Sequence, residues 1–208
     1  GFFSRLILKL ACWCSIYTED YRQPELRTNP PSGLYISNHQ SYMDIPLMLT
    51  QYQVLPIMKK EVMYIPVFGV IAIAAGALPV SRGKRDSRKK VFIAAKKRLV
   101  DDKFSVQYYP EGTRSRSGKP RRYDEIKVTL IQLAYECNVP VIPISMYGSC
   151  NVLTKKGSLN PGQKLGIITH KALIPSEFSD VNAFTKAAWQ QVLTGYDLLE
   201  AKLGPQQS

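Results

Sequence analysis

Short apolar runs and segments of helical period alternate along most of this 208-residue chain. Apolar runs bounded by Gly, Pro or polar residues are typical of buried strands. The chain predicts such strands at Leu34–Ser37, Val54–Met58, Gly76–Val80, Phe104–Tyr109, Val139–Met146 and Lys164–Thr169. Apolar residues at helical spacing predict helices that begin after Ser41 and at Arg85–Val100, Asp124–Cys137 and Asp180–Ala201. Strands that alternate with helices favour an α/β layered fold, with a central mixed sheet flanked by helices.

The amino-terminal segment Gly1–Tyr17 is apolar, with Arg5 and Lys9 inside it. It is short for a membrane span, so it fits either a helix that lies at a membrane surface or an ordinary amphipathic helix on the core. The polar, proline-containing stretch Thr18–Ser32 is expected to be a connection. We therefore expect an N-terminal membrane-associated helix at residues 1–22 and a globular domain at residues 23–208.

The segment Val62–Val80 carries no charged residue over about the length of a membrane span. Pro66, Gly69 and Pro79 interrupt it, and these residues break or weaken helices. We expect a buried or interface-dipping helix that is followed by a strand, rather than a transmembrane helix.

The charge balance points to an acidic partner. Lys and Arg number 28 against 16 Asp and Glu, which gives a net charge of +12. Such a surface suits nucleic acid, anionic lipid or a phosphorylated substrate. The four cysteines form no Cys-x-x-Cys pair, and the only histidines are His39 and His170, so a metal site is not expected.

His39 and Asp44 are the first candidate pair for chemistry. On one continuous helix they would lie about 140° apart, too far round the axis to meet. If His39 precedes the helix and Asp44 lies in its first turn, the carboxylate can reach the ring, fix its tautomer and stabilise the imidazolium. The same spacing also fits a capping box in which Ser41 caps the helix, and the two interpretations are compatible.

The second candidate segment is Tyr109–Ser115, where a predicted strand ends in a turn through Pro110 and Gly112. Backbone N–H groups in such a turn, together with Thr113 and Arg114, can bind an anionic oxygen. The alternative is a polar turn with a surface ion pair.

Together these segments resemble the 1-acylglycerol-3-phosphate acyltransferase family, within the wider glycerophospholipid acyltransferases. His39 and Asp44 match its His-x4-Asp motif. Residues 109–115 match its Phe-Pro-Glu-Gly-Thr-Arg-Ser motif, with Tyr109 in place of the usual Phe. Leu78–Arg82 and Val139–Ile144 stand where the family has its second and fourth motifs, in the family's order.

The resemblance implies a glycerol-3-phosphate acyltransferase-like fold and a role for each motif residue. His39 would act as the general base that deprotonates the acceptor hydroxyl, and Asp44 would orient it. The hydroxyl would attack a thioester carbonyl directly, without an acyl-enzyme. The residues expected to bind substrate are Lys60, Arg82, Glu111, Gly112, Thr113 and Arg114, with Lys127 as an additional candidate. Of these, Lys60, Arg82 and Arg114 would contact the acceptor phosphate.

The implied reaction moves a fatty acyl group from acyl-CoA or acyl carrier protein to the sn-2 hydroxyl of 1-acyl-glycerol-3-phosphate, which gives phosphatidic acid. It needs no cofactor beyond the thioester co-substrate. The expected partners are the lysophospholipid, the acyl thioester, anionic lipid at a membrane surface, and acyl carrier protein as a candidate. The expected location is the cytoplasmic face of a membrane, as a peripheral or monotopic protein.

Two alternatives remain open from the sequence. The acceptor could be another lysolipid, such as a lyso-ornithine lipid, because Ile126–Thr129 and Ser81 depart from the family pattern. The chain could also be a basic lipid- or nucleic-acid-binding protein without catalysis. The basic stretch Arg82–Arg98 has no aromatic stacking platform and no known reader motif, so nucleic acid is not the expected partner.

Overall fold

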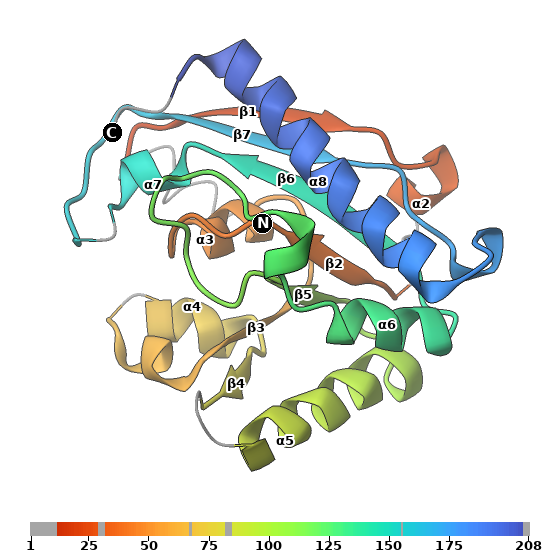
Figure 1. The fold of residues 1–208 in the computed structure, drawn as a ribbon. Helices are drawn as coiled ribbons and strands as arrows, with labels where there is room; N and C mark the ends of the chain where they lie inside the picture. Colours follow the sequence, from red (N-terminus) through yellow and green to blue (C-terminus); the bar gives the residue numbers. More distant parts are fainter. Residues whose placement is uncertain (1–11, 29–31, 67, 82–84, 155, 206–208) are drawn as a thin grey trace.

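A seven-stranded sheet forms the centre of the protein in the computed structural model (Figure 1). The structure describes residues 12–28, 32–66, 68–81, 85–154 and 156–205. The strands are β1 (Ser15–Asp20), β2 (Leu34–Ser37), β3 (Leu55–Lys59), β4 (Leu78–Val80), β5 (Val106–Tyr108), β6 (Val141–Tyr147) and β7 (Lys164–Thr169). Their order across the sheet is β1-β7-β6-β2-β5-β3-β4. Every neighbouring pair is parallel except β6 and β7, so the predicted mixed sheet is confirmed.

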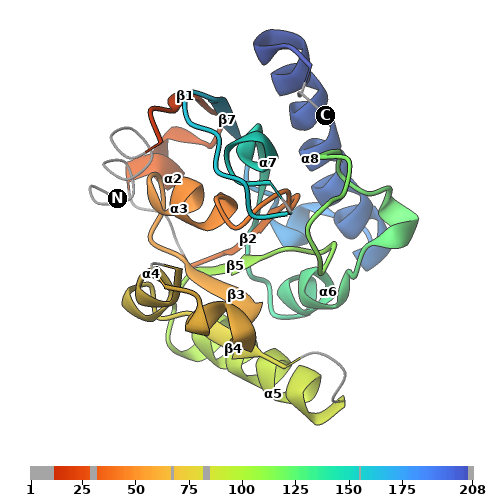
Figure 2. The same ribbon diagram turned by 90° about the vertical axis from the view of Figure 1, so that its left-hand side faces the viewer.

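Helices cover both faces of this sheet. The α-helices are α2 (Pro24–Thr28), α3 (Asp44–Leu49), α4 (Phe68–Ala74), α5 (Arg85–Lys96), α6 (Thr129–Glu136), α7 (Ser149–Val152) and α8 (Val181–Leu203). The 3-10 helices are η2 (Lys60–Tyr64), η4 (Tyr123–Glu125) and η5 (Pro175–Glu177), and η3 (Lys97–Asp101) is a π-helix that continues α5. Helix α8 crosses one face of the sheet, whereas α3 and α7 lie on the other (Figures 1 and 2). The result is the α/β layered fold that the alternation of elements predicted.

The alternation of side chains along the central strands explains why both faces are covered. In β2, Leu34 and Ile36 pack in one core cluster with α6 and α8, and Tyr35 packs in the other with α3. Every residue of β2 and β6 is buried. A strand that is apolar on both sides requires a layer of helices on each side.

Several predicted elements agree closely with the structure. Strands β2 and β7 have the predicted bounds, and α8 begins one residue after its N-cap Asp180. The Asp180 carboxylate accepts hydrogen bonds from the backbone N–H groups of Asn182 and Ala183, at 2.8 and 2.9 Å. The helix expected at Asp124–Cys137 is shorter, because η4 and a loop precede α6.

The amino-terminal expectation needs correction. Residues 1–11 lie outside the described part, but Ser15–Asp20, inside the helix expected at residues 1–22, is strand β1. It pairs in parallel with β7, so the layered domain begins before residue 23. The stretch expected to be a connection also contains α2. Ile16, Tyr17 and Thr18 are β-branched or aromatic residues that favour strands, and no residue of β1 is completely buried, as suits a strand at the edge of the sheet.

The uncharged segment Val62–Val80 contains the short helix α4 and then β4, as predicted. None of the helices in the described ranges has both the length and the apolar character needed to cross a membrane. Tyr64, Val70 and Ile73 are among the most exposed large hydrophobic side chains, at 72, 70 and 68%.

The side chain of Asn38 extends the sheet beyond the end of β2. Ser37 pairs in register with Ile144, and Asn38 follows it. The Asn38 Nδ2 donates to the carbonyl of Met146, and the Met146 N–H donates to Asn38 Oδ1, both at 2.8 Å. The side-chain amide therefore replaces two backbone hydrogen bonds of the ladder, and it fixes the point at which the chain leaves the sheet toward His39.

We predict that Asn38→Ala lowers the free energy of unfolding by about 2–4 kcal/mol, because both Met146 backbone groups lose a buried partner. Urea denaturation would measure the change. Asn160→Ala is the matched control: this exposed side chain donates one hydrogen bond, to Asn151, so its loss should cost within about 0.5 kcal/mol. Equal effects of the two substitutions would contradict this account of Asn38.

Candidate active site

Two loops meet where β2 and β5 end. These strands are parallel neighbours, so their carboxyl ends lie at the same edge of the sheet. The loop after β2 carries His39, and the loop after β5 carries residues 109–115. The Ser115 N–H donates to the carbonyl of His39 at 2.7 Å, which joins the two loops directly. The fold thus brings together the two segments that the sequence singled out.

His39 and Asp44 form a hydrogen-bonded pair. The His39 Nδ1 lies 2.7 Å from Asp44 Oδ2. His39 lies in the loop before α3, and Asp44 is the first residue of that helix. The turn between them allows a contact that a continuous helix would prevent.

The Asp44 carboxylate is completely buried and accepts several hydrogen bonds. Its Oδ2 also accepts the backbone N–H groups of Gln40 and Ser41, at 2.8 and 3.0 Å. The hydroxyl of Ser149, at the start of α7, donates to Oδ1. These donors stabilise the ionised form of a group that would otherwise be costly to bury.

The N-cap of α3 is Met43 and it makes no side-chain capping hydrogen bond, so the prediction that Ser41 caps the helix is wrong, although one contact of a capping box is present. The Asp44 carboxylate receives the Ser41 N–H, as in a capping box, while Ser41 Oγ donates to the carbonyl of Leu153 at 2.7 Å and receives the Met43 N–H at 3.4 Å. The same carboxylate therefore closes the turn and contacts the imidazole.

This arrangement defines the chemistry available to His39. Because Nδ1 donates to the Asp44 carboxylate, the lone pair of the neutral ring is on Nε2. The His39 side chain is 14% exposed and lines a pocket. The ring also stacks on the phenol of Tyr109, with the ring centres 4.1 Å apart. A base held in one tautomer and one orientation is suited to remove a proton from a bound hydroxyl.

Glu111 lies behind the loops rather than in the pocket. It is 4% exposed, and its carboxylate accepts the N–H groups of His39 at 3.3 Å and Arg121 at 3.0 Å. Burial raises the pKa of this carboxyl to about 7, although the two hydrogen bonds oppose the shift. Glu111 was expected to bind substrate, but in this structure it connects the two loops and residue 121.

Gly112 is required by the turn. Its φ is +65°, and its N–H donates to the carbonyl of Tyr109 at 3.0 Å. An added Cβ would lie 3.2 Å from Nζ of Lys127, so the amine rests against the Gly112 backbone. Gly112 and its neighbour Thr113 both line the pocket, as their predicted role requires.

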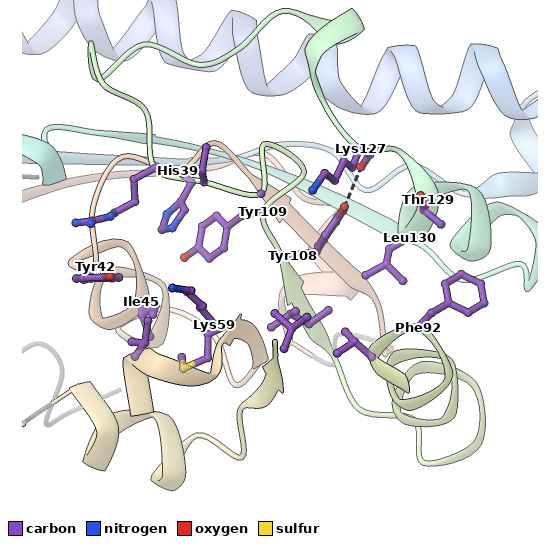
Figure 3. Close-up of a pocket in the computed structure, with 18 residues that line it drawn as sticks. His39, Tyr42, Ile45, Lys59, Phe92, Tyr108, Tyr109, Lys127, Thr129 and Leu130 are labelled. Atoms are coloured by element: carbon purple, nitrogen blue, oxygen red, sulfur yellow. Dashed lines mark hydrogen bonds between the residues drawn. The ribbon is translucent and has the colours of Figure 1, made fainter. Parts of the chain in front are cut away.

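The pocket has a volume of about 580 Å³ and opens beside His39 (Figure 3). Part of its wall is polar and basic, and the rest is apolar. The polar and aromatic lining residues are His39, Tyr42, Lys59, Tyr108, Tyr109, Gly112, Thr113, Arg114, Lys127 and Thr129. The apolar lining residues are Ile45, Ile57, Met58, Val62, Val80, Val91, Phe92 and Leu130. Such a pocket can hold a molecule with a charged head and a hydrocarbon chain.

The basic residues of the pocket differ in part from those expected. Arg114 lines it, with the guanidinium carbon 4.0 Å from the centre of the Tyr42 ring. Lys127, the additional candidate, also lines it. Lys60 does not: it is exposed on η2, and the neighbouring Lys59, at the end of β3, points into the pocket instead. Arg82 lies outside the described residues, so its role stays a prediction.

Two further contributors to the site have no local signal in the sequence. Ser149 contacts Asp44 across 105 positions of the chain, and Arg121 contributes only a backbone N–H to Glu111. Among the described residues, no group of His, Cys, Asp and Glu side chains has the arrangement of a metal site. Four basic residues of the adjoining loop line a second hollow beside the pocket: Arg114, Arg116, Lys119 and Arg121.

Sequence comparison finds similar proteins among known acyltransferases. The profile of the Acyltransferase family matches residues 19–147. The chloroplastic 1-acyl-sn-glycerol-3-phosphate acyltransferase BAT2 of Brassica napus is 32% identical over 84% of this chain and 52% of its own length. The 1-acyl-sn-glycerol-3-phosphate acyltransferase of Haemophilus influenzae is 25% identical over 88% of this chain and 73% of its own length. The chain thus spans about half the length of the plant relative.

The fold is shared with a solved relative. The crystal structure of the 1-acyl-sn-glycerophosphate acyltransferase PlsC from Thermotoga maritima superposes with a TM-score of 0.73 at 26% identity. The match covers 91% of this chain and 74% of that one. The family profile covers more than half of the chain, including both loops of the pocket. The chain therefore belongs to the Acyltransferase family and is a relative of the 1-acyl-sn-glycerol-3-phosphate acyltransferases.

Proposed function

We propose that this protein transfers a fatty acyl group from a thioester donor to the sn-2 hydroxyl of 1-acyl-glycerol-3-phosphate, which gives phosphatidic acid. The observation that carries the proposal is the His39–Asp44 pair at the wall of a pocket that is both basic and apolar. The relatives of this chain named above carry the same activity in their names.

The proposed reaction needs one base. The acceptor hydroxyl gives its proton to His39 Nε2 while its oxygen attacks the thioester carbonyl carbon. The Asp44 carboxylate stabilises the imidazolium that forms. The tetrahedral intermediate then breaks its C–S bond, and the thiolate takes the proton from the imidazolium. The products are an ester and a free thiol, and His39 returns to its neutral form.

The walls of the pocket support this choice of substrates. Lys59, Arg114 and Lys127 offer cationic groups to an acceptor phosphate. Apolar side chains such as Ile57, Phe92 and Leu130 line the rest of the pocket, where hydrocarbon would lie. The donor is proposed to be acyl-CoA or acyl carrier protein, and both present the acyl group as a thioester.

We further propose that the protein works at the surface of a membrane, on its cytoplasmic face. The exposed side chains of Tyr64, Val70 and Ile73 lie on η2 and α4, and Val62 of the same segment lines the pocket. Apolar side chains that insert into lipid, together with cationic groups that attract anionic headgroups, provide the two contributions that stable association requires.

The catalytic role of His39 is tested by offering the purified protein 1-acyl-glycerol-3-phosphate and other lysolipids with each donor, and identifying products by mass. We predict that His39→Ala abolishes transfer and that Asp44→Asn lowers kcat by about 10²–10⁴-fold, because a neutral partner stabilises the imidazolium less. Circular dichroism would verify that each variant is folded. Turnover near that of the wild type in His39→Ala would exclude the mechanism. If the wild type prefers another acceptor, such as a lyso-ornithine lipid, to 1-acyl-glycerol-3-phosphate, that acceptor would replace the proposed substrate.

The phosphate contact is tested by a pair of neighbouring lysines. Lys59→Ala should raise the KM for 1-acyl-glycerol-3-phosphate by about 10–100-fold, since a charge-assisted contact is worth about 1.5–3 kcal/mol. Lys60→Ala, on the exposed neighbour, should change it by less than about threefold. The effect of Lys59→Ala should disappear with a monoacylglycerol, which lacks the phosphate. A large effect of Lys60→Ala alone would restore the assignment made from the sequence.

Membrane association is tested by sedimentation with vesicles. Binding of the wild type should rise with anionic lipid content and fall only partly in high salt, because the apolar contribution persists. Val70→Glu and Ile73→Glu should each weaken binding by about tenfold or more, since a buried aliphatic side chain contributes about 1.5–3 kcal/mol. Leu198→Glu, at a 51% exposed position on α8, is the control. Equal losses at all three positions would contradict docking through α4.

A further inference from the structure

The hydroxyl of Ser149 reaches the Asp44 carboxylate from a part of the chain that lies outside both loops of the pocket. Ser149 is the first residue of α7, and it is completely buried. Helix α7 follows β6 and lies on the same face of the sheet as α3, the helix that Asp44 begins (Figure 1). The Ser149 hydroxyl contacts Oδ1 of Asp44 and also lies 3.2 Å from Oε1 of Gln40. A hydroxyl has one proton to donate, and the closer, ionised acceptor takes it.

The two oxygens of the Asp44 carboxylate have different partners. Oδ2 accepts from the ring of His39 and from two backbone N–H groups of the same loop. Ser149 is the one donor to Oδ1 among the described residues. Donors on both oxygens fix the plane of a carboxylate, because a rotation that keeps one set of hydrogen bonds breaks the other. Without the Ser149 hydroxyl, a buried oxygen would have no partner, and the carboxylate could turn away from the ring.

The sheet holds the start of α7 in place. Gly148, the N-cap residue of α7, has a φ of +85°, and an added Cβ would lie 2.1 Å from the carbonyl oxygen of Lys164 in β7. Only a glycine allows the two backbones to approach so closely. The Ser149 hydroxyl is therefore carried by the β6–β7 side of the sheet, and its position does not depend on the loop that carries His39.

We propose that Ser149 is a positioning residue for the reaction: its hydroxyl orients the Asp44 carboxylate so that Oδ2 keeps the proton of His39 on Nδ1 and the lone pair on Nε2. The effect on catalysis rests on the proposed function, whereas the effect on the ring can be observed without substrate. Ser149 acts on the substrate only through Asp44 and His39, and it does not line the pocket that the described residues form.

The second histidine of the chain provides an internal reference. The Nε2 of His170 lies 2.8 Å from Ser145 Oγ, and this hydroxyl gives its own proton to the carbonyl of Val192, also at 2.8 Å. His170 therefore carries its proton on Nε2, the opposite of His39. Burial lowers the pKa of His170 to about 4, so this ring stays neutral. Because the chain has only two histidines, comparison with His170→Gln assigns the ring nitrogens of both in nitrogen-15 NMR spectra.

Ser149→Ala tests the proposal. We expect kcat for acyl transfer to fall by about 10–100-fold, less than for Asp44→Asn because the carboxylate remains, and the KM for the acceptor to stay within about twofold. In spectra of the protein without substrate, at an alkaline pH where imidazoles are neutral, the share of His39 rings protonated on Nδ1 should fall. Ser149→Cys keeps nearly the same volume but offers only a weak donor, so it should change both quantities in the same direction.

A double substitution tests whether Ser149 acts through the carboxylate. In the Asp44→Asn protein, Ser149→Ala should change kcat by less than about threefold, because residues that act as a unit have non-additive effects. An undiminished effect in that background would mean that Ser149 acts by another route, and the inference would be wrong.

Ser145→Ala is the matched control. Ser145 is also completely buried and its hydroxyl also makes two hydrogen bonds, but these go to His170 and Val192 instead of the site. Its substitution should lower the thermal midpoint by a similar amount and change the His170 signals, while kcat and the His39 signals stay as in the wild type.

Two results would overturn the inference alone, in an active protein: a loss of kcat in Ser149→Ala no larger than in Ser145→Ala, or unchanged His39 signals. A wild-type chain without transfer activity would overturn the proposed function, and the His39 signals would then still decide whether Ser149 orients the carboxylate.

Discussion

The buried carboxylate of Asp44 is the constraint on which the site depends. An ionised group with no exposure is stable only if donors surround it. Its partners come from the His39 ring, from the backbone between β2 and α3, and from Ser149 at the start of α7. The chain between Asn38 and Asp44 therefore follows a path that directs its hydrogen-bond donors at the buried carboxylate. The orientation of the imidazole is a consequence of that requirement.

Buried polar groups also hold the neighbouring loops in place. Asn38, at the start of the loop after β2, forms hydrogen bonds with β6. Glu111, in the loop after β5, accepts hydrogen bonds from the backbone of His39 and Arg121. Each of these side chains is more than nine-tenths buried and makes two hydrogen bonds to backbone groups. Side chains that hydrogen-bond to the backbone in this way restrict the conformation of a loop, which a site for chemistry requires.

The charges of the site are separated into two layers. Asp44 and Glu111 lie behind the loops, whereas Lys59, Arg114 and Lys127 face the pocket. The pocket wall therefore presents cations to an anionic substrate, and Glu61, which is not part of that wall, forms an ion pair with Lys59 at 3.4 Å. Much of the rest of the pocket wall is apolar, so one cavity suits both the phosphate and the hydrocarbon of a lysolipid.

Local patterns in the sequence determined much of the fold and the identity of the principal pair. Apolar runs located β2 and β7, apolar residues at helical spacing located α8, and a helix predicted to begin after Ser41 left His39 in the preceding loop. These features depend on residues that are close in the chain. The short strand β1 was missed because its stability comes from pairing with β7, almost 150 residues away.

The tertiary structure decided the features that depend on distant partners or on the direction of a side chain. Whether Lys59 or Lys60 enters the pocket depends on the direction of each side chain where β3 ends, and adjacent lysines look alike in a sequence. Ser149 reaches Asp44 only because α7 follows β6 beside the loop after β2. The opposite proton positions of His39 and His170 are visible only once every neighbour is in place, because the partner that each ring meets is a property of the surroundings and not of the residue.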